Sequence, residues 1–318
     1  MLDRAADDLE RGGPVAGALA GHGDAAASMP ALRLMGAVHR LVLAGEAPAL
    51  AAHFPSAGGD GDPAAAWPAF RDLLAERRDR VGELVPRPVQ TNEPGRCAAL
   101  LGGLLLAEAR GGHPLRLLEV GASAGLNLHP DRFGYASGEA RWGDPGSAVQ
   151  LTDVFAGTRR PRRRPLRVAE RAGSDPEPLD PGSEEDRQSL RAYVWANMAE
   201  RLRRLEAALD LAAAPPERVE RAGAGAWLGR RLERPVEGRT TVVVHTIVMQ
   251  YVTEGERAEV DALLEAAGAW ATPRAPLARL SMEPGGARAD VRLRLWPGGE
   301  EQLVARSGYH GPPVEWLG

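Results

Sequence analysis

The residues with the clearest chemical potential lie between positions 116 and 128, where a short apolar run leads into an acid and a glycine loop. The run ends near Glu119, and Gly121 and Gly125 follow at the spacing G-x-x-x-G. Nucleotide sites of α/β proteins are built in this order, at the end of a buried strand. The same loop fits the G-x-S-x-G pattern of serine hydrolases, with Ser123 at its centre. The segment therefore predicts either a nucleotide-type site or a nucleophile.

In the nucleotide interpretation, each residue of the loop has a physical task. Gly121 lets the backbone turn at the end of the strand, and Gly125 keeps a following helix close to the strand and the ligand. Backbone N–H groups and the positive end of that helix favour a carboxylate or phosphate. Glu119 can accept hydrogen bonds from a ligand amine. Because the spacing differs from the dinucleotide pattern G-x-G-x-x-G, a cationic ligand such as S-adenosylmethionine suits the loop better.

In the hydrolase interpretation, Ser123 is a nucleophile on a strained turn. His310 would be its base, and Asp261 or Asp290 would orient the histidine. The order of elements argues against this, because such a nucleophile normally follows several earlier strands. Here residues 1–110 have the pattern of helices, so the strand before the loop is predicted to be the first of its sheet.

The spacing of apolar residues divides the chain into two parts. It predicts a helical N-terminal region over residues 1–112 and a Rossmann-like α/β domain over residues 113–318. The run Thr240–His245 has no polar alternation, as in a strand buried on both faces, and it indicates a mainly parallel sheet covered by helices. Strands are predicted at Leu115–Val120, Leu166–Glu170, Arg218–Arg221, Thr240–His245, Leu277–Met282, Val291–Trp296 and Gln302–Ala305.

The helical pattern also recurs outside the first region. One helix is predicted over Gln188–Leu211, and another from Thr253 to about residue 267, where a capping-box spacing opens it. Asn92 can cap a helix that precedes the glycine strand. The arginine run 159–164 has no interleaved aromatic residue, so a solvated loop is the favoured interpretation.

The C-terminal strands allow an argument from connection length. Only six residues, Glu283–Arg288, could join the strand that ends at Met282 to the next one. A parallel crossover needs a dozen or more residues, so this pair must be antiparallel. The tight turn Pro297–Glu300 reverses the chain again. Glu283 and the segment Gly308–His310 are therefore predicted to finish at one edge of the sheet, beside an antiparallel C-terminal part.

Three side chains at this edge are candidate catalytic residues. His245 ends the most buried strand, where ligands collect in open α/β sheets, and Glu283 and His310 join it by the connection argument. A hydrogen-bonded core histidine explains His245 equally well, and Glu283 could instead cap a helix or pair with an arginine. Asn92 and Arg96 could close over the site, with Arg96 on the cofactor carboxylate, but ordinary capping and a surface arginine fit them as well.

Composition excludes several classes of protein. With 318 residues, 44% of them hydrophobic, the chain can bury a sizeable core, and no segment is apolar enough to span a bilayer. A net charge of -4 favours neither nucleic acid nor an anionic membrane as a partner. The single cysteine, Cys97, excludes a disulfide within the chain and a cysteine-based metal cluster, and no metal is expected.

Two further features of the chain bear on chemistry and location. The chain has no lysine, which rules out Schiff-base catalysis and a phosphate-binding lysine. The N-terminus lacks the basic-then-apolar pattern of a signal peptide, so we expect a cytoplasmic protein. The expected partner is a small-molecule substrate.

Several segments, taken in order, resemble the bacterial domain of unknown function 2332 family. The resemblance extends from about Leu32 to the end of the chain. It implies membership but no activity, because the family is uncharacterised. The matching segments are Gln90–Glu93, Leu117–Leu128, Trp142–Pro145, Gly173–Asp180 and Tyr309–Gly311.

The glycine loop by itself resembles motif I of class I S-adenosylmethionine-dependent methyltransferases. This resemblance implies a class I methyltransferase-like fold with S-adenosylmethionine as the cofactor. In such enzymes an acid after the second strand binds the ribose hydroxyls, and the best match here is Asp175, with Asp144 and Asp180 as rivals. The residues expected around the cofactor are Glu119, Gly121, Ser123, Gly125, Asn127, Asp175, Asn92 and Arg96.

The leading hypothesis is a methyltransferase that uses S-adenosylmethionine on a small molecule. Methyl transfer needs mainly in-line positioning, and a base helps only where the acceptor must lose a proton. The alternatives are an α/β serine hydrolase that uses Ser123 and a non-catalytic methyltransferase-like protein that binds a nucleoside. The methyl acceptor is not identified by any residue pattern in the chain.

Overall fold

The computed structural model describes residues 1–21, 29–157, 159–214 and 219–318. Its contacts divide the chain into a helical unit, residues 1–91 and 182–206, and an α/β unit, residues 92–181 and 207–318. This division differs from the single boundary at residue 112 that the sequence pattern suggested. Helix α7 (Arg96–Gly111) belongs with the sheet, because it packs along several strands. Residues 182–206 return to the helical unit, which no local pattern signals.

The helical unit is built from short helices around one apolar core. Asp62 caps helix α5 (Pro63–Glu76), because its side chain accepts hydrogen bonds from the N–H groups of residues 64 and 65. Val38, Phe70 and Val81 are fully buried in the core. The helices are α1 (Leu2–Glu10), α2 (Pro14–Leu19), α3 (Pro30–Leu43), α4 (Pro48–Ala51), α5 (Pro63–Glu76), α6 (Arg78–Leu84) and α8 (Glu184–Ala192).

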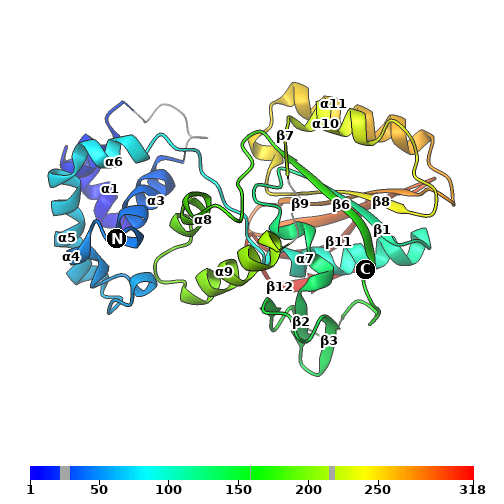
Figure 1. Ribbon diagram of the computed structural model, residues 1–318, viewed down its shortest axis with the longest axis horizontal. Coiled ribbons are helices and arrows are strands. Elements are labelled where there is room, and N and C mark those ends of the chain that lie inside the picture. Colours follow the sequence, from blue (N-terminus) through cyan, green and yellow to red (C-terminus); the bar gives the residue numbers. More distant parts are fainter. Residues whose placement is uncertain (22–28, 158, 215–218) are drawn as a thin grey trace. The chain divides into compact units, whose positions relative to one another are not determined.

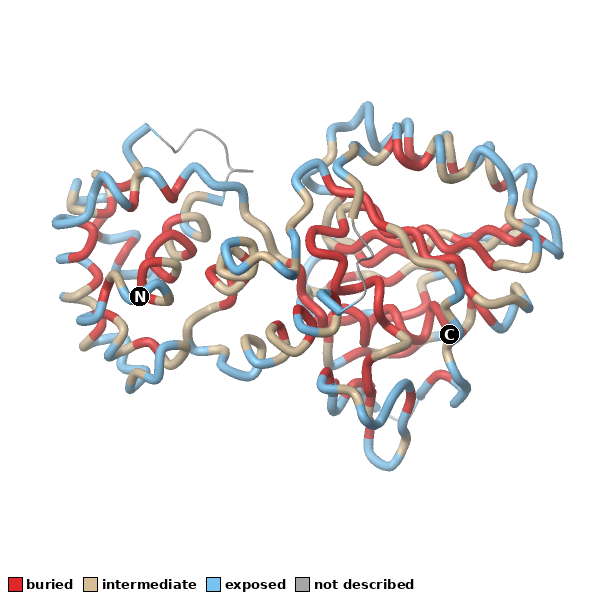
Figure 2. Tube along the Cα trace, in the orientation of Figure 1, coloured by how far each residue is buried: buried red, intermediate tan, exposed pale blue. Residues whose placement is uncertain are grey.

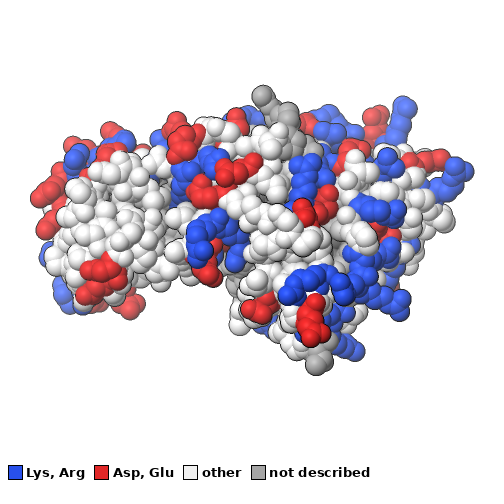
Figure 3. Space-filling view, turned by 60° about the horizontal axis from the view of Figure 1, so that its bottom comes forward, with Lys and Arg blue, Asp and Glu red and all other residues white. Residues whose placement is uncertain are grey.

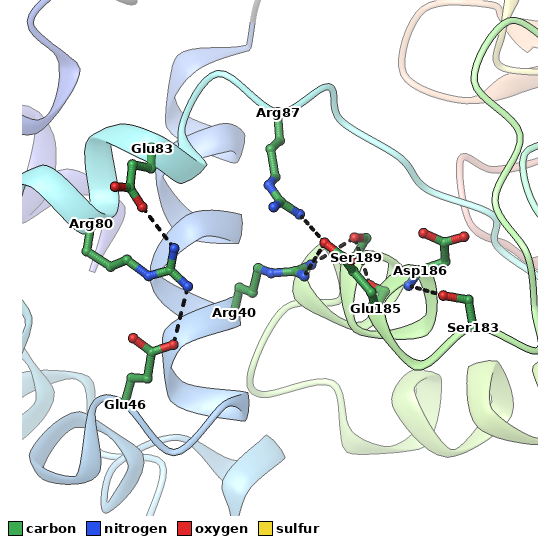
Figure 4. A network of polar contacts seen from close by, with 9 residues as sticks. All are labelled: Arg40, Glu46, Arg80, Glu83, Arg87, Ser183, Glu185, Asp186 and Ser189. Carbon is green, nitrogen blue, oxygen red and sulfur yellow. Dashed lines mark hydrogen bonds and ion pairs between the residues drawn. The ribbon is translucent and has the colours of Figure 1, made fainter.

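Helix α8 joins this unit from far along the sequence, and polar contacts connect it to the earlier helices (Figure 4). Arg40 of α3 donates to the Ser189 hydroxyl of α8 at 2.8 Å, and Arg87 donates to Glu185 at 3.4 Å. The Arg87–Glu185 contact is an exposed ion pair, and such pairs contribute little stability. The ring of Tyr193, just after α8, lies so close to Gly36 of α3 that a Cβ there would meet it at 2.6 Å. Packing rather than charge therefore holds α8 in place.

The single helix predicted over Gln188–Leu211 is wrong. The structure has α8 and a separate helix, α9 (Ala199–Ala213), with an irregular segment between them. Helix α8 ends where the buried side chain of His39 bonds the carbonyl of Ala192 at 3.1 Å through Nδ1. That carbonyl would otherwise accept the next helical N–H. The apolar spacing continues across the break, so periodicity alone did not reveal it.

The α/β unit contains a nine-stranded sheet within the described residues, in the order β5-β12-β11-β10-β9-β8-β1-β6-β7. Strands β7, β6, β1, β8 and β9 are parallel to one another, and β10, β11 and β12 alternate in direction. The strands are β1 (Leu115–Val120), β5 (Phe155–Ala156), β6 (Val168–Asp175), β7 (Glu220–Arg221), β8 (Thr240–Thr246), β9 (Leu277–Pro284), β10 (Ala289–Trp296), β11 (Gln302–Gly308) and β12 (Gly311–Trp316).

This sheet confirms a mostly parallel α/β architecture with an antiparallel edge. The predicted strand Leu166–Glu170 starts later and runs to Asp175, and the first residue of the predicted strand Arg218–Arg221 lies outside the described residues. The antiparallel pairing of β9 with β10 is confirmed. Strand β12 was missed, because Pro312 and Pro313 argue against a strand in the sequence.

The order of the strands reverses at β1. Among the parallel strands from β1 to β9, the order runs outward from β1 to β6 and β7 and then continues with β8 on the other side of β1. In open α/β sheets, ligands bind outside the carboxyl ends of the strands at such a reversal. The topology therefore points to the carboxyl ends of β1 and β8.

Helices cover both faces of the sheet. Helices α10 (Ala224–Arg231) and α11 (Glu254–Ala269) lie over one face and α7 lies over the other (Figure 1). The predicted capping box at the start of α11 is confirmed, with Thr253 and Glu256 each bonding the other's backbone. All residues of β1 and β8 are buried, as the red central strands of Figure 2 show.

The segment after the glycine loop departs from expectation, because no α-helix follows it. It forms two short 3-10 turns, η3 (Leu126–Leu128) and η4 (Pro130–Arg132). An α-helix that began at Leu126 would need an N–H at residue 130, and proline has none. The chain then enters a small sheet of β2 (Gly134–Ser137), β3 (Ala140–Gly143) and β4 (Gln150–Leu151).

The surface of the protein carries charges of both signs. The arginine run 159–164 has no regular secondary structure, and all five of its arginines are exposed, as expected of a solvated loop. Figure 3 shows basic and acidic side chains intermixed on one face of the molecule. Among the described residues, no helix has the length and apolar character needed to cross a membrane.

Candidate functional site

The carboxyl ends of β1, β6, β8 and β9 bring most of the predicted residues to one edge of the sheet. Glu119 of β1 lies opposite Gly173 of β6 on one side and Val244 of β8 on the other. His245 and Glu283 are close to the ends of β8 and β9. The site can therefore be built outward from the glycine loop.

The glycine loop has an unusual backbone. Gly121, Ser123 and Gly125 all have positive φ, at 69°, 52° and 74°. A serine in this left-handed region is strained, and such strain persists only where neighbouring groups enforce it. The end of β6 supplies those groups: Asp175 Oδ2 accepts the N–H of Ser123 at 2.9 Å, and the Ser174 carbonyl accepts the N–H of Gly121 at 2.8 Å.

Most of the loop's N–H groups are already engaged, and this corrects the expectation of an anion cradle. Besides the contacts to β6, the N–H of Gly125 donates to the Ala122 carbonyl at 2.7 Å. The N–H of Leu126 donates to Asn92 Oδ1 at 3.0 Å. Asn92 therefore caps the turn after the loop instead of helix α7, whose N-cap is Gly95. With no helix end here either, the loop does not offer a phosphate or carboxylate the predicted set of donors.

We predict that Gly121→Ala destabilises the protein by about 2 kcal/mol or more, because alanine at positive φ is strained and its Cβ would meet Val248 Cγ2 at 2.4 Å. Gly238→Ala is the matched control, since Gly238 has a φ of 71° with open space around it. The control should cost only about 1 kcal/mol. Urea unfolding of both variants measures the difference, and equal losses would contradict close packing of the loop on Val248.

Asp175 is the acid that the structure brings to the loop. Its Oδ1 accepts the N–H of Glu177 at 2.9 Å, so each carboxylate oxygen holds one backbone N–H and keeps a lone pair for a ligand. Asp144 lies in an exposed turn after β3, and Asp180 is exposed. Of the three predicted acids, Asp175 is the one positioned by the strand next to β1.

We predict that Asp175→Ala costs about 1–3 kcal/mol and releases the strained loop, because the buried N–H of Ser123 loses its acceptor. Hydrogen exchange should show faster exchange at the Ser123 amide. Asp144→Ala is the control, since its Oδ1 also accepts a backbone N–H, from Gly146 at 2.8 Å, but in an exposed turn. Unchanged Ser123 protection in Asp175→Ala would contradict the anchoring role.

Glu119 is buried, with 2% of its surface exposed. Burial raises the pKa of Glu119 to about 8, and Asp175 adds to the rise, while the Asn127 side chain and the Arg96 guanidinium counter part of it. Glu119 Oε2 has no hydrogen-bond partner among the described residues. Buried polar atoms rarely stay unpaired in a protein, so Glu119 is ready for a ligand donor.

Glu119 is one of several buried polar side chains at this edge with an atom that lacks a hydrogen-bond partner among the described residues. Three more buried polar atoms near the strand ends lack a partner within the described parts of the chain: Asn127 Nδ2, Ser174 Oγ and Glu283 Oε2. They belong to η3, β6 and β9, which converge at this edge. A concentration of unpaired buried atoms at one place is the signature of a binding site. Ser174 was missed by sequence reasoning, although it lies one residue before the predicted Asp175.

Arg96 lies at the start of α7 and is buried. Its Nε donates to the Tyr309 carbonyl at 3.2 Å, and its Nη1 donates to the Thr246 carbonyl at 3.2 Å. These two bonds connect the end of β8 to the turn between β11 and β12. They confirm that both segments finish at the same edge of the sheet. Burial lowers the pKa of Arg96, and the carboxylates of Glu93, Glu119 and Glu283 oppose that shift.

His245 and Glu283 form a close pair, with Nδ1 of the histidine 2.6 Å from Oε1 of the glutamate. The other ring nitrogen, Nε2, accepts a hydrogen bond from Arg279 Nε at 3.0 Å. Arg279 in turn donates to Asp261 at 2.6 Å. Both nitrogens of His245 are therefore occupied, and the atom of the pair that remains unpaired is Glu283 Oε2.

The loop after β8 connects this pair to the glycine loop. Ile247 has a φ of 50°, which is an outlier for a β-branched residue. This turn directs the N–H of Val248 to Glu283 Oε1 at 3.4 Å, while the Val248 side chain packs against Gly121. Strained residues cluster at functional sites, and here Ser123 and Ile247 flank the same edge.

The remaining predicted residues are less well placed for chemistry. His310 is exposed in the turn between β11 and β12. Asp261 and Asp290, the acids of the hydrolase hypothesis, accept hydrogen bonds from arginines. Cys97 is fully buried, its thiol donates to Asn127 Oδ1 at 3.3 Å, and burial raises the pKa of that thiol. It is an inert core residue that helps to fix Asn127.

The sequence model of a bacterial family described as "Uncharacterized protein conserved in bacteria (DUF2332)" matches residues 1–316. Searches of the curated proteins and of the solved structures gave no significant match.

Proposed function

The chain belongs to this uncharacterised bacterial family, and from that starting point we propose that it is an S-adenosylmethionine-dependent methyltransferase that acts on a small molecule. One observation carries the proposal. A carboxylate oxygen without a partner among the described residues, Glu119 Oε2, is buried beside the side-chain amide of Asn127, which interacts with the same carboxyl group. An acceptor and a donor of this kind match the ammonium and the carboxylate of an amino acid.

The methionyl end of S-adenosylmethionine is such an amino acid, so these residues fit the cofactor. Glu119 would hold the ammonium and Asn127 the carboxylate. Asp175 offers a lone pair on each oxygen for the ribose hydroxyls, from the end of the strand next to β1. When bound, the cofactor supplies a methyl group on a positively charged sulfur.

Topology supports the same assignment. The parallel strands β7-β6-β1-β8-β9, numbered in chain order among themselves, run 3-2-1-4-5, as in Rossmann-like sheets. The glycine loop follows the first of them, as motif I does in class I methyltransferases. This chain differs from such enzymes in one respect, because no α-helix follows the loop. Recognition of the cofactor therefore depends on the side chains of Glu119 and Asn127 and not on backbone N–H groups.

Charge at the site also favours a cation. Glu93, Glu119 and Glu283 all interact electrostatically with Arg96, and Asp175 interacts with Glu119. Three carboxyl groups thus lie within electrostatic reach of Arg96, and a fourth lies within reach of Glu119. A sulfonium ligand gains from such surroundings, because an opposite charge nearby stabilises it in a partly dry site.

Calorimetric titration with S-adenosylmethionine and S-adenosylhomocysteine tests the proposal. We expect binding of both, and no measurable binding at millimolar ligand would refute it. A fluorophosphonate probe tests the hydrolase alternative separately. Reaction of the wild type with this probe that is lost in Ser123→Ala would support a serine nucleophile, whereas no reaction together with cofactor binding by the wild type would separate the two functions.

A further inference from the structure

Glu283 has two carboxylate oxygens with different surroundings. Oε1 accepts the N–H of Val248 at 3.4 Å and lies 2.6 Å from His245 Nδ1. Oε2 is buried and has no partner among the residues that the structure describes. One oxygen is thus fixed by the protein, and the other is free for a ligand.

The protonation of His245 follows from its neighbours. A guanidinium can only donate, so the bond from Arg279 Nε at 3.0 Å makes His245 Nε2 an acceptor. The ring proton then lies on Nδ1 and is donated to Glu283. His245 has no lone pair left for a substrate proton, and it acts as a positioning residue for Glu283.

Glu283 ends β9, two strands away from Glu119 of β1, with β8 between them. Val248 bonds Glu283 through its N–H and touches Gly121 with its side chain. Arg96 interacts with both Glu119 and Glu283. The edge thus has two carboxylate oxygens without a partner among the described residues, Glu119 Oε2 on β1 and Glu283 Oε2 on β9.

We propose that Glu283, held in place by His245, binds and deprotonates a basic nitrogen, so that the methyl acceptor is a small-molecule amine. This inference rests on the proposed methyltransferase function. An ammonium is the donor that best satisfies a buried carboxylate oxygen, since it brings both a hydrogen bond and the opposite charge. A carboxylate is too weak a base to ionise an ordinary alcohol, so a hydroxyl acceptor fits it less well.

The proton balance is as follows. The bound ammonium gives one proton to Glu283 Oε2, which frees the nitrogen lone pair. That lone pair forms the N–C bond to the methyl carbon while the C–S bond breaks and leaves its electron pair on sulfur. The methylated amine leaves in its protonated form, the sulfur becomes a neutral thioether, and the proton on Glu283 passes to water.

Sinefungin provides a test that needs no knowledge of the acceptor. It carries an amine on carbon at the position where S-adenosylmethionine carries its methyl group, and S-adenosylhomocysteine has no charge there. If Glu283 faces that position, the wild type should bind sinefungin about tenfold or more tightly than S-adenosylhomocysteine. In Glu283→Gln this preference should fall to nearly one, with S-adenosylhomocysteine binding nearly unchanged.

Glu265→Gln is the control, because Glu265 pairs with Arg294 on the exposed part of α11. It should keep the full preference. No preference in the wild type, or a preference that survives in Glu283→Gln, would overturn the inference. A loss of S-adenosylhomocysteine binding in Glu283→Gln would also overturn it, because Glu283 would then belong to the cofactor. Failure of the wild type to bind S-adenosylhomocysteine would instead refute the proposed function.

Two substitutions of His245 test its positioning role. The side-chain amide of His245→Asn can replace Nδ1–H as the donor to Glu283, whereas His245→Leu cannot. We expect His245→Asn to keep most of the sinefungin preference and His245→Leu to lose it. If His245 were only a packing residue, both variants would be less stable but would keep the same preference.

Discussion

Glu119→Gln is expected to weaken S-adenosylmethionine binding by about 100-fold or more, because it removes the charge that faces the ligand ammonium at a buried position. Glutamine has nearly the same size and still offers one carbonyl oxygen, so the loss reports charge and not shape. Titration calorimetry on wild type and variant measures the ratio. A change of less than about threefold would contradict the role of Glu119.

The same variant should be more stable than the wild type in the absence of ligand, by roughly a few degrees in Tm at pH 8. The folded-state pKa of Glu119 is about 8, against an unfolded value near 4.5, so the folded protein holds this proton more tightly. The stability that comes from Glu119 is complete below about pH 4.5 and is lost as the pH rises through about 8. Glutamine cannot ionise and avoids that loss.

Glu108→Gln is the control for both measurements. Glu108 is also fully buried and has an unpaired Oε2, but it lies near the end of α7 and bonds Arg167. This variant should bind the cofactor like the wild type and should be less stable, since it weakens the bond that Arg167 makes to a buried carboxyl group. A gain in stability together with a loss of binding is expected only at Glu119, where a carboxylate is kept buried for a ligand.

Cofactor binding should also depend strongly on pH. With a pKa of about 8 in the ligand-free protein, only about 1% of Glu119 is ionised at pH 6. A cationic ligand needs the ionised form, so its affinity should rise about tenfold per pH unit from pH 6 to pH 8 and level off above. The neighbouring groups, Arg96 and Asp175, act on this pKa in opposite directions, lowering and raising it respectively.

The proton that Glu119 loses on binding can be counted. Calorimetry at pH 7 in two buffers of different ionisation enthalpy should show release of nearly one proton per ligand bound. Glu119→Gln should release almost none, and its weak binding should vary little between pH 6 and pH 8. Pure uptake of protons, or an affinity that falls with rising pH in this range, would be inconsistent with a neutral Glu119 in the ligand-free state.

Several features of the fold followed from the sequence because their causes are local. An apolar run that ends in an acid and glycines marks β1 and its loop, and the lack of polar alternation in Thr240–His245 marks a central parallel strand. The length of a connection is also a local property, and six residues are too few for a crossover to a parallel neighbouring strand. For this reason, the shared edge of Glu283 and residues 308–310 was predictable without coordinates.

Other features required the tertiary structure, because they depend on contacts between distant segments. The carbonyl of Ala192 is taken by His39, which divides one apparent helix into two. Ser123 is held at positive φ by Asp175, 52 positions away. Periodicity and spacing carry no information about such partners.

Local pattern alone therefore locates the candidate site, through the glycine loop, the buried strands and the forced antiparallel edge. The contacts formed on folding set what each side chain can do there. Arg279 occupies the free nitrogen of His245, and burial leaves one oxygen of Glu283 and one of Glu119 without a partner. The physical reason is that strand position follows from local pattern, whereas desolvation and hydrogen-bond partners depend on side chains that only folding brings together.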